Sequence, residues 1–509
     1  MDVSRITPAV LTEDRLDASY YGTRYLQNEA FLKKCGVPMV PVGTLTDKCN
    51  CGATPKEVIY DGKGTGLVRT TDVRPNVFLA EGVLRTSELR VSPDASVAAV
   101  PGDLLYTMSG TIGYAAVIHD GVDVVSFSNT IARARFATRT GQDARFTAAF
   151  FNCKYGYTQS LRLVSGGIQG HVMPNPFKRL PVPTPAPEAQ RYIGDKVRLA
   201  ERLRERARRL EAAVATTHEQ YMVPPTGIDF AKRTRRLVAR SLTERLDAHF
   251  YPSAVEQYFR QLGGPTRSLD RLCSIVVNGQ SQPEAEEGVR QATVTNLGRS
   301  FVEGSLRTVQ RPADGARALA PHDLLLCNAA HNKIYIGRDV TYSQVEGPYA
   351  STEVMVVRVD RTQLPASFVR HYLKTEIGYL QVQSTIRGIT AHSYPTDVKL
   401  LQIPIPAVHA ADREAWFATD DQMLVGGRCF DAARVLTSVA TTLVEHLIDG
   451  RITETDLVSA QKALDAGDGS ADREILKGLR QSDVPDAKPL IADVDAFYAL
   501  LDASAGQDA

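Results

Sequence analysis

The chain has 509 residues, of which 43% are hydrophobic and 23% charged, and its formal net charge is +1. This length allows two or more cores of ordinary domain size, and the composition excludes a disordered or fibrous protein. The near-neutral charge excludes a uniformly basic nucleic-acid binder, so such a function would need locally concentrated cations. Because we find neither a signal peptide nor a membrane-spanning run of apolar residues, we expect a cytoplasmic location.

Seven cysteines, an odd number without regular spacing, favour a reducing compartment. Cys35, Cys49 and Cys51 are close enough in sequence to supply three zinc ligands, but no fourth ligand stands at a standard spacing. Buried or idle thiols are the simpler interpretation. We therefore expect no metal and no cofactor.

The first part of the chain opens with residues 15–21, RLDASYY, and is predicted to contain mainly short strands. Branched and aromatic residues favour strands over 103–106, 123–127 and 131–136. An amphipathic helix is predicted over about 144–155. The region ends at 180–187, LPVPTPAP, where alternating prolines favour extended chain.

From Pro187 to about Tyr221 the strand signal disappears, and apolar residues recur every three or four positions. They are Ile193, Val197, Ala200, Leu203, Ala207, Leu210 and Val214. Pro187 suits an early helix position, and about 34 residues at 1.5 Å each give a rod of roughly 50 Å. The spacing predicts one long helix with a coiled-coil-like apolar seam.

A basic linker follows this helix. Its cations, with no acid between them, are Lys232, Arg233, Arg235, Arg236 and Arg240. They favour contact with phosphates. A solvated linker, or contact with a partner protein, explains them equally well.

The chain then repeats its own motifs in order. RLDASYY at 15–21 returns as RLDAHFY at 245–251, at an offset of 230 residues. PGDLLYT at 101–107 returns as PHDLLLC at 321–327, and GIQGHVMP at 167–174 returns as GITAHSYP at 388–395, at offsets of 220 and 221. The pair Gly156-Tyr157 matches Gly378-Tyr379. A repeat of this length means two whole domains rather than stacked solenoid units.

The second repeat is predicted to have strands over 323–326 and 353–359 and a helix over 367–377, and it ends at IPIP, 403–406. A second long helix is predicted from about Asp412 to Leu447. Its apolar seam contains Leu436, Val439, Leu443 and Leu447, and Gly426-Gly427 predicts a break or kink. Antiparallel packing of the two long helices would bury both seams. The alternative is that each helix caps its own domain.

The predicted fold class is α+β, with two mostly-β domains separated by two long antiparallel coiled-coil-like helices and related by a pseudo-twofold internal repeat. The predicted division is a first domain over 1–185, a first spacer helix with basic linker over 186–245, a second domain over 246–407, a second spacer helix over 408–449 and a helical tail over 450–509. Within the tail, helices are predicted over 454–466 and 493–503, with a flexible link at 467–470, and we expect it to serve as a docking element.

Motifs of self-contained catalysis are missing. The sequence has no GxxxxGK[ST] loop, GxSxG elbow, HExxH pair or NPPY-type tetrapeptide. The glycine-rich segment 62–66 predicts a mobile loop, and Asp397-Val398-Lys399 resembles a nuclease motif only at the level of chance. His171 and His392 share a column of the repeat, which a common turn explains. The sequence therefore argues against an enzyme.

The order of these motifs resembles that of specificity (S) subunits of type I restriction–modification systems. The strings PGDLLYTMSGTIGYAAV, SNTIARARF and GYTQSLRLVSGGIQGHVMPNPFKRLPVPTPAPEAQRYI carry the resemblance, which extends over roughly 15–447. It implies that each repeat holds a target recognition domain reading one half of a split site in double-stranded DNA. It further implies that the helices space these domains and bind two methyltransferase subunits, that motor–nuclease subunits join for restriction in anti-phage defence, and that the chain itself catalyses nothing.

The second repeat departs from this pattern. Residues 109–113, SGTIG, are matched by 328–333, NAAHNK, and Gln190 has no clear match near Asp412-Arg413. An asymmetric DNA site is therefore expected. One rival interpretation is an S-like scaffold of another defence system without sequence reading, and another is a nuclease with an unrecognised site.

Base reading needs polar side chains on exposed loops, and glycines there let backbone amides approach phosphates. The DNA-binding candidates in the first repeat are Arg69, Arg74, Ser109, Gly110, Thr111, Gly167, Gln169 and His171. Those in the second repeat are Asn328, Asn332, Lys333, Arg387 and Thr390. Each of these residues can equally be a turn residue that holds the fold.

Overall fold

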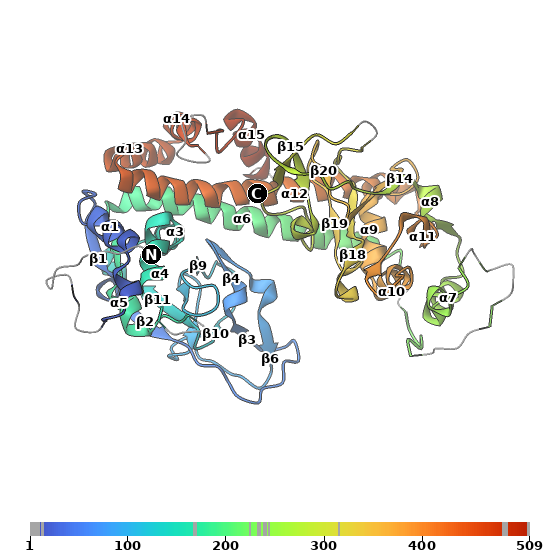
Figure 1. Ribbon diagram of the computed structural model, residues 1–509, viewed down its shortest axis with the longest axis horizontal. Helices are drawn as coiled ribbons and strands as arrows, with labels where there is room; N and C mark the ends of the chain where they lie inside the picture. The colour runs from blue at the N-terminus through green and yellow to red at the C-terminus, as the bar shows by residue number, and fades with distance from the viewer. Residues whose placement is uncertain are drawn as a thin grey trace. The chain divides into compact units, whose positions relative to one another are not determined.

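The computed structural model describes residue 11 and residues 15–165, 170–222, 225–231, 236–237, 242, 245–313, 316–480 and 487–505, with side chains as far as 502. The chain divides into two compact units (Figure 1). Unit 1 comprises Met1–Leu203 and Ala432–Ala509, and unit 2 comprises Arg204–Asp431. Each unit thus contains one repeat and one half of each long helix. The finer five-part division stays a prediction.

Unit 1 is mixed α+β. Its strands are β1 (Met39–Pro41), β2 (Thr46–Cys51), β3 (Thr65–Val68), β4 (Val73–Arg74), β5 (Val77–Phe78), β6 (Leu84–Thr86), β7 (Ala98–Ala99), β8 (Leu104–Thr107), β9 (Ala115–Val117), β10 (Val125–Phe127), β11 (Ile131–Phe136) and β12 (Pro181–Pro183). Its helices before the long one are η2 (Ala18–Tyr21), α1 (Thr23–Leu32), α2 (Val42–Leu45), η3 (Thr70–Asp72), η4 (Ala80–Gly82), η5 (Thr138–Thr140), α3 (Ala144–Asn152), α4 (Lys154–Arg162) and α5 (Pro174–Arg179).

The strands of unit 1 form two four-stranded sheets, of order β2-β11-β8-β9 and β6-β3-β10-β7, and the pairs β1-β12 and β4-β5. One buried core draws side chains from both larger sheets, including Leu105 and Ile131 from the first and Val68, Val125 and Phe127 from the second. The predicted strands over 103–106, 123–127 and 131–136 are confirmed within a residue or two, because their branched residues fill this core.

Unit 2 repeats this topology. Its strands are β13 (Thr266–Ser268), β14 (Cys273–Asn278), β15 (Glu284–Ala292), β16 (Arg307–Val309), β17 (Leu324–Cys327), β18 (Ala329–Ala330), β19 (Val340–Tyr342), β20 (Tyr349–Ala350), β21 (Val354–Val359), β22 (Ala391–His392) and β23 (Gln402–Pro404). Its helices before the second long one are η7 (Ala248–Phe250), α7 (Ser253–Leu262), α8 (Leu269–Leu272), η8 (Val294–Asn296), η9 (Lys333–Tyr335), α9 (Ala366–Lys374), α10 (Glu376–Ser384), α11 (Pro395–Val398) and η10 (Ala410–Asp412).

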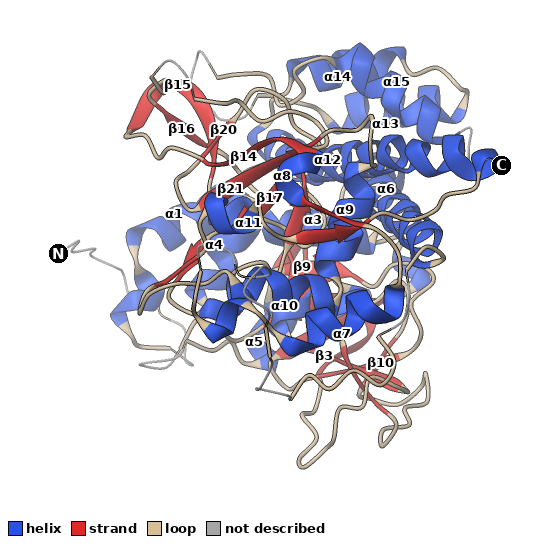
Figure 2. Ribbon diagram, turned by 90° about the vertical axis from the view of Figure 1, so that its right-hand side faces the viewer, coloured by secondary structure: helices blue, strands red, loops and turns tan. Residues whose placement is uncertain are grey.

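The sheet β14-β21-β17-β19 has the same order as the β2-β11-β8-β9 sheet of unit 1, and β13-β23 corresponds to β1-β12. The smaller sheet β16-β15-β20, which Figure 2 shows beside β14, has only three strands. A core containing Val302, Leu325 and Val356 joins the sheets. The internal repeat of the sequence is therefore a repeat of the fold.

The helix predicted over 144–155 is wrong in its length, because the structure has two helices, α3 and α4, separated by Cys153. Cys153 is extended, with ψ of 165°. A Cβ atom on Gly156, in the first turn of α4, would lie 2.1 Å from the carbonyl oxygen of Phe150. The second repeat has the same junction, where a Cβ on Gly378 would lie 2.1 Å from the oxygen of Tyr372. The repeated Gly-Tyr pair thus marks a close helix junction that only glycine permits.

The two long helices are α6 (Pro187–Glu219) and α12 (Arg413–Asp449). Their predicted seam residues are buried, apart from the partly buried Leu210. The predicted break at Gly426-Gly427 is wrong, since α12 is continuous through both glycines. A Cβ atom on Gly427 would lie 2.5 Å from the Cβ of Gln344, so glycine here admits close packing of the sheet domain.

Within unit 2 the two helix segments run in opposite directions. Ala207 of α6 lies close to Gly426 of α12. About three turns further along α6 lies His218, and Tyr221 follows just beyond the end of the helix. Their rings lie 6.3 and 6.0 Å from the ring of Trp416, which precedes Gly426. The two helix segments of unit 2 are therefore antiparallel.

The tail folds as α13 (Glu454–Asp465), α14 (Ser470–Gly478) and α15 (Val494–Ala505). The first and last were predicted, whereas α14 was not. Its buried Asp472 accepts hydrogen bonds from Tyr192 and Lys196 of α6, at 2.5 and 2.6 Å. At nine residues it is too short to be stable on its own, and so short a segment gives only a weak helix signal in sequence. No helix among the described residues combines the length and apolarity that crossing a membrane requires.

Candidate nucleic-acid interface

The RLDA motif of the first repeat forms an arginine clamp. Arg15 donates to the carboxylate of Asp17 at 2.6 Å and to the carbonyl oxygens of Leu163 and Val164 at 3.2 and 3.1 Å. The hydroxyl of Tyr21 donates to the carbonyl oxygen of Arg15 at 2.6 Å. Hydrogen bonds from the arginine lower the pKa of Asp17 far below its usual range. The motif thereby fixes the chain where it leaves α4.

The second repeat builds the same clamp. Arg245 donates to Asp247 at 2.6 and 2.7 Å and to the carbonyl oxygen of Thr385 at 3.1 Å, and Tyr251 donates to the carbonyl oxygen of Arg245 at 2.7 Å. Here the arginine also meets Asp397, at 3.1 Å. Each clamp therefore lies directly before a candidate DNA-binding loop.

The Pro-x-Asp motif places a buried aspartate just before a core strand, β8 in unit 1 and β17 in unit 2. Asp103 is buried, accepts the amide of Val100 at 3.0 Å and pairs with Arg135 of β11 at 2.7 and 2.8 Å. In unit 2, Asp323 accepts the amide of Ala320 at 2.8 Å and pairs with Arg358 at the same two distances. Losing one partner would leave a buried charge, so both motifs hold the fold.

The residue inside this turn differs between the repeats. Gly102 has φ of +89°, and His322 occupies the same position with φ of +72°. A side chain at positive φ is strained. The imidazole Nδ1 of His322 lies 2.6 Å from the hydroxyl of Tyr342, a contact that offsets the strain.

Unit 1 brings several predicted site residues together. Ser109 forms a bridge with His171, and the amide of Val172 donates to the carbonyl oxygen of Met108 at 2.8 Å. A Cβ atom on Gly110, which has φ of +74°, would lie 3.7 Å from the hydroxyl of Thr70. Thr111 is exposed beside Gly110. The loops around 70, 110 and 171 therefore form one surface. Gly167 and Gln169 lie outside the described residues.

The two predicted arginines of unit 1 differ. Arg69 pairs with the buried Asp72 at 3.1 Å and donates to the carbonyl oxygen of Gly82 at 2.8 Å, so it holds η3 in place. Arg74 is exposed at the end of β4. Within the described part of the chain no hydrogen bond or ion pair engages it, which leaves its guanidinium available to a ligand.

Unit 2 brings the corresponding loops together. Strand β18 pairs with β22 through Ala329 and His392, and the amide of Ser393 donates to the carbonyl oxygen of Asn328 at 2.8 Å. This hydrogen bond is the counterpart of the one between Val172 and Met108. His171 and His392 thus share a backbone position in a two-loop ladder, as their common column suggested.

The predicted site residues of unit 2 have different surroundings. Asn328 is buried and donates to the carbonyl oxygen of Thr352 at 3.0 Å, so its side chain faces the interior. Arg387 pairs with the buried Asp397, with Nε to Oδ2 at 2.7 Å. Arg387 is nevertheless 46% exposed, and Asn332, Lys333 and Thr390 are exposed as well.

A four-residue insertion explains the divergence of the second loop. Gly113 and Gly337 both have positive φ, and added Cβ atoms would meet Ser160 of α4 at 2.8 Å and Val382 of α10 at 2.3 Å, which are equivalent positions. Between matched strand ends and glycines, unit 1 has residues 108–112, whereas unit 2 has 328–336. Matching 109–113 to 328–333 was therefore wrong. The dipeptides Ile112-Gly113 and Ile336-Gly337 were the signal that could have corrected it.

The Asp397-Val398-Lys399 segment has a structural role. Asp397 is buried between Arg245 and Arg387 and accepts hydrogen bonds from both. Among the described residues, no group of three or more His, Cys, Asp or Glu side chains is arranged to hold a metal.

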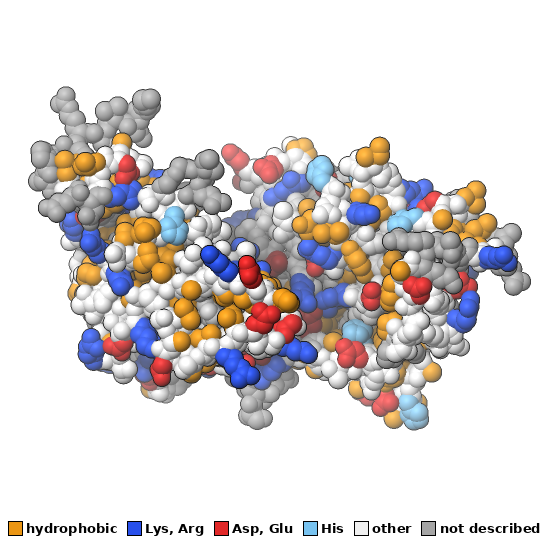
Figure 3. Space-filling view, turned by 90° about the horizontal axis from the view of Figure 1, so that it is seen from below, with side chains coloured by type: hydrophobic (Ala, Val, Ile, Leu, Met, Phe, Trp, Pro, Cys, Tyr) orange, Lys and Arg blue, Asp and Glu red, His pale blue; other side chains and the backbone are white. Residues whose placement is uncertain are grey.

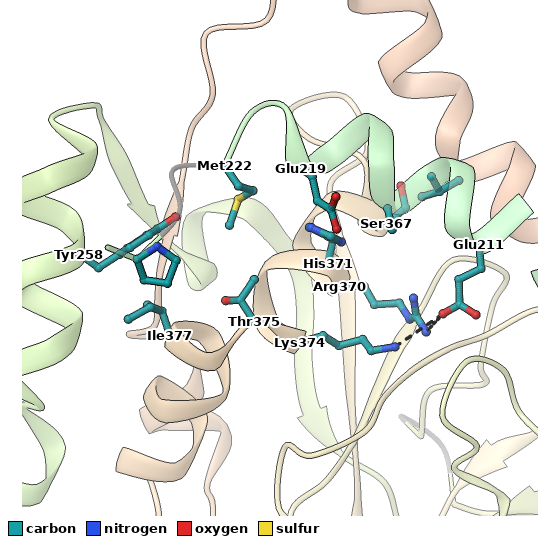
Figure 4. A pocket seen from close by; sticks show the side chains of 13 residues that line it. Glu211, Glu219, Met222, Tyr258, Ser367, Arg370, His371, Lys374, Thr375 and Ile377 are labelled. Atoms are coloured by element: carbon teal, nitrogen blue, oxygen red, sulfur yellow. Dashed lines mark hydrogen bonds and ion pairs between the residues drawn. The ribbon is translucent and has the colours of Figure 1, made fainter. Parts of the chain in front are cut away.

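A hollow of about 500 Å³ in unit 2 lies at the end of α6 (Figure 4). Glu211 pairs there with Arg370 at 2.7 Å and with Lys374 at 3.6 Å. Burial, together with the neighbouring Arg370, lowers the pKa of Lys374 to about 8. Arg370 also donates to the carbonyl oxygens of Val340 and Arg299. Glu211 thus pairs with both Arg370 and Lys374, and these ion pairs hold α9 against α6.

On the face drawn in Figure 3, the basic side chains of the described residues do not form one continuous patch. Of the five cations of the predicted basic linker, only Arg236 lies within the described residues. On the face drawn in Figure 3, basic, acidic and apolar side chains are interspersed over each unit. Phosphate contacts on this face would have to come from single cations.

No family model matches the chain, and no curated protein matches it in sequence. Among solved structures, the type I restriction–modification S subunit from M. genitalium has 11% identity and a TM-score of 0.38, with 84% of this chain and 96% of that chain covered. The HsdS subunit from Thermoanaerobacter tengcongensis has 16% identity and a TM-score of 0.25, with 82% and 97% covered. A chain from a structure concerned with assembly and conformational transition of the type I R-M system has 15% identity and a TM-score of 0.27, with 84% and 97% covered. The similarity to each of these three chains extends over most of this chain and nearly all of the other.

Proposed function

We propose that the chain is the sequence-specific DNA-recognition subunit of a type I-like restriction–modification complex and has no catalytic activity of its own. Each repeat is a target recognition domain that reads one half of a bipartite site in double-stranded DNA. The two long helices form an antiparallel coiled-coil-like spacer, dock two methyltransferase subunits and, for restriction in anti-phage defence, allow motor–nuclease subunits to join. The complex works in the cytoplasm.

The observation that carries this proposal is that the same pair of loops is built twice. In each repeat, an arginine clamp holds the chain before one of two loops that the same backbone hydrogen bond joins, and a Pro-x-Asp ion pair holds the start of the strand that leads into the other loop. A supporting frame that is retained while its exposed loop residues change is what reading two different half-sites requires. The motif order of the sequence supports the same conclusion.

Base contacts come from the loops, and phosphate contacts fix the register. In unit 1 the reading residues are Ser109, Gly110, Thr111 and His171, with Gly167 and Gln169 of the adjoining segment as further candidates, and Arg74 contacts the backbone. In unit 2 they are Asn332, Lys333 and Thr390. The side chains of Arg69, Asn328 and Arg387 support their loops. Because the second loop is four residues longer, the half-sites differ and the whole site is asymmetric.

Two measurements test this proposal. Duplexes selected from a random pool by the full chain should share two unlike half-sites at a constant distance. Methylome sequencing of the host with and without the gene should show the same split motif methylated only when the gene is present. Duplex binding without any common motif would overturn the proposal and favour a scaffold that does not read sequence.

A further inference from the structure

The loops of unit 2 border a hollow of about 710 Å³. Ala329, Asn332 and Tyr335 line it from one loop, and Thr390 and His392 line it from the other. The pairing of β18 with β22 holds the two loops together at its edge. Asn332 and Thr390, which the sequence nominated separately as base readers, therefore face one space.

The four-residue insertion supplies one wall of this hollow. Its turn begins at Asn332, whose side-chain oxygen accepts the amide of Ile334 at 3.1 Å. That hydrogen bond leaves the amide NH2 group of Asn332 without a partner among the described residues, and the hydroxyl of Thr390 has none there either. An amide NH2 and a hydroxyl are groups that pair with the edges of bases.

The lining of the hollow is mixed, with Asp339 and Glu353 beside the aromatic ring of Tyr335, and an exposed aliphatic side chain, Ile389, directly precedes the lining residue Thr390. Ile389 is fully exposed at the tip of its loop, after Gly388 with φ of +77°. Tyr335 is 45% exposed, and the guanidinium of Arg338 lies 4.6 Å from the centre of its ring. Aliphatic side chains at loop tips can wedge between base steps, and exposed aromatic rings stack on unpaired bases.

We propose that unit 2 unstacks one base of its half-site. Ile389 inserts at the base step, and the displaced base stacks on Tyr335 inside the hollow, where Asn332 and Thr390 contact its edge. Stacking on the aromatic ring offsets the loss of stacking within the duplex. This inference rests on the proposed function, because duplex DNA must first be bound.

Unit 1 provides an internal comparison. Residues 167–169, GIQ, repeat the Gly-Ile step of 388–390, so the isoleucine is common to both repeats. The loop 108–112, MSGTI, has no aromatic residue and lacks the inserted turn, so this loop offers no ring to receive a displaced base. The half-site read by unit 1 should therefore remain stacked. Unstacking is a property of one half-site only.

The test uses the full chain and a duplex selected by it. Each adenine is replaced in turn by 2-aminopurine and each cytosine by pyrrolocytosine, fluorescent bases that brighten on unstacking. Thymines are probed by permanganate oxidation, and guanines are tested by replacing them with 2-aminopurine opposite thymine. We expect a strong change in fluorescence or permanganate reactivity on binding at one position in one half-site. Ile389→Ser should abolish it, and Ile59→Ser, at an exposed isoleucine of unit 1, should leave it unchanged.

Affinity gives a second readout. Tyr335→Ala should weaken binding about tenfold, the usual effect of losing one base–aromatic stack. Specific binding with no unstacked position, or a signal that survives Ile389→Ser, would overturn the inference and leave the proposed function intact. If the chain selects no split motif, the proposed function fails and the inference fails with it.

Discussion

The two repeats attach to the long helices through the same anionic position, but the anion comes from opposite sides. In unit 1, Asp143 caps its own helix α3, accepting the amides of Arg145 and Phe146 at 2.8 and 3.0 Å, and pairs with Arg198 of α6. In unit 2, Asp420 of α12 caps α9, accepting the amides of Ala366 and Ser367 at 3.1 and 2.8 Å.

The acidic and basic partners of this ion pair are thus reversed in unit 2 relative to unit 1. Asp420 pairs with Arg361 of the sheet domain at 2.7 Å, whereas in unit 1 the arginine belongs to the helix. A carboxylate at a helix N-terminus is stabilising whichever element supplies it. Each domain is consequently matched to its own helix half, and an exchanged pair would place like charges together.

The largest effect should come from Asp420→Ala. Asp420 is fully buried and serves two backbone amides and an arginine. Its loss leaves Arg361 without its buried partner, and we expect a cost of about 3–5 kcal/mol for opening α9. Hydrogen exchange of the α9 amides measures this cost. Asp421→Ala, whose side chain is 73% exposed, is the matched control and should change exchange little.

The same comparison shows what the sequence could and could not predict. The RLDA, Pro-x-Asp and Gly-Tyr motifs could be matched between the two repeats from sequence alone. Each occupies a backbone position that requires the same residue type in both repeats. Gln190 was noted as a signature without a counterpart. Its side-chain oxygen accepts the amide of Asp143 at 2.9 Å, and in unit 2 the capping carboxylate stands on the helix instead. When the capping role moves from one structural element to another, the two repeats no longer have matching residues at aligned positions.

Two of the missed features have a common physical origin. The junction at Cys153 and the uninterrupted course of α12 through Gly426-Gly427 depend on tertiary contacts rather than on local periodicity. The helix α14 is amphipathic, but its nine residues are few for a helix signal. In the candidate site, many of the residues that the sequence nominated lie on two neighbouring loops of each repeat. The sequence did not distinguish the buried Asn328 from the exposed Asn332, because both are polar loop residues and only packing separates them.

Acid should destabilise unit 2 through His218. Burial lowers the pKa of this histidine from 6.5 to about 3, and its ring packs against Phe368 and Trp416. In this pH range His218 is protonated in the unfolded chain but stays neutral in the folded chain. The free energy of unfolding therefore decreases as the pH falls from 6.5 towards 3. We expect a loss of about 2 kcal/mol at pH 5.

Hydrogen exchange of α9 at pH 7 and pH 5 measures this loss. His218→Gln has no proton to take up in this range, so the part of the pH dependence due to His218 should vanish in the variant. An equal acid effect in wild-type and variant chains would contradict the assignment. Burial also lowers the pKa of His371 nearby, so a smaller dependence of the same sign should persist.

A smaller effect is expected for Asp143→Ala in unit 1. This residue caps α3 as Asp420 caps α9, but its partner Arg198 is 35% exposed and keeps a second pairing with Asp195. Losing the cap should cost about 1–2 kcal/mol in the exchange of α3 amides. Asp195→Ala is the control that weakens Arg198 without removing the cap. A cost equal to that of Asp420→Ala would mean that the two attachments are equivalent.

The smallest expected effect is on DNA binding, and it distinguishes Arg74 from Arg69 in unit 1. Arg74→Ala should leave the melting temperature unchanged and weaken duplex binding a few-fold, with the slope of log affinity against log salt reduced by about 1, because one phosphate contact is lost. Arg69→Ala should instead lower the melting temperature, because Asp72 is buried and depends on this arginine. Salt-dependent binding and thermal melting of both variants distinguish a ligand contact from a support of the fold. If Arg74→Ala changes neither the affinity nor the salt slope, the DNA surface of unit 1 lies at the loops around Ser109 and His171 without extending to β4.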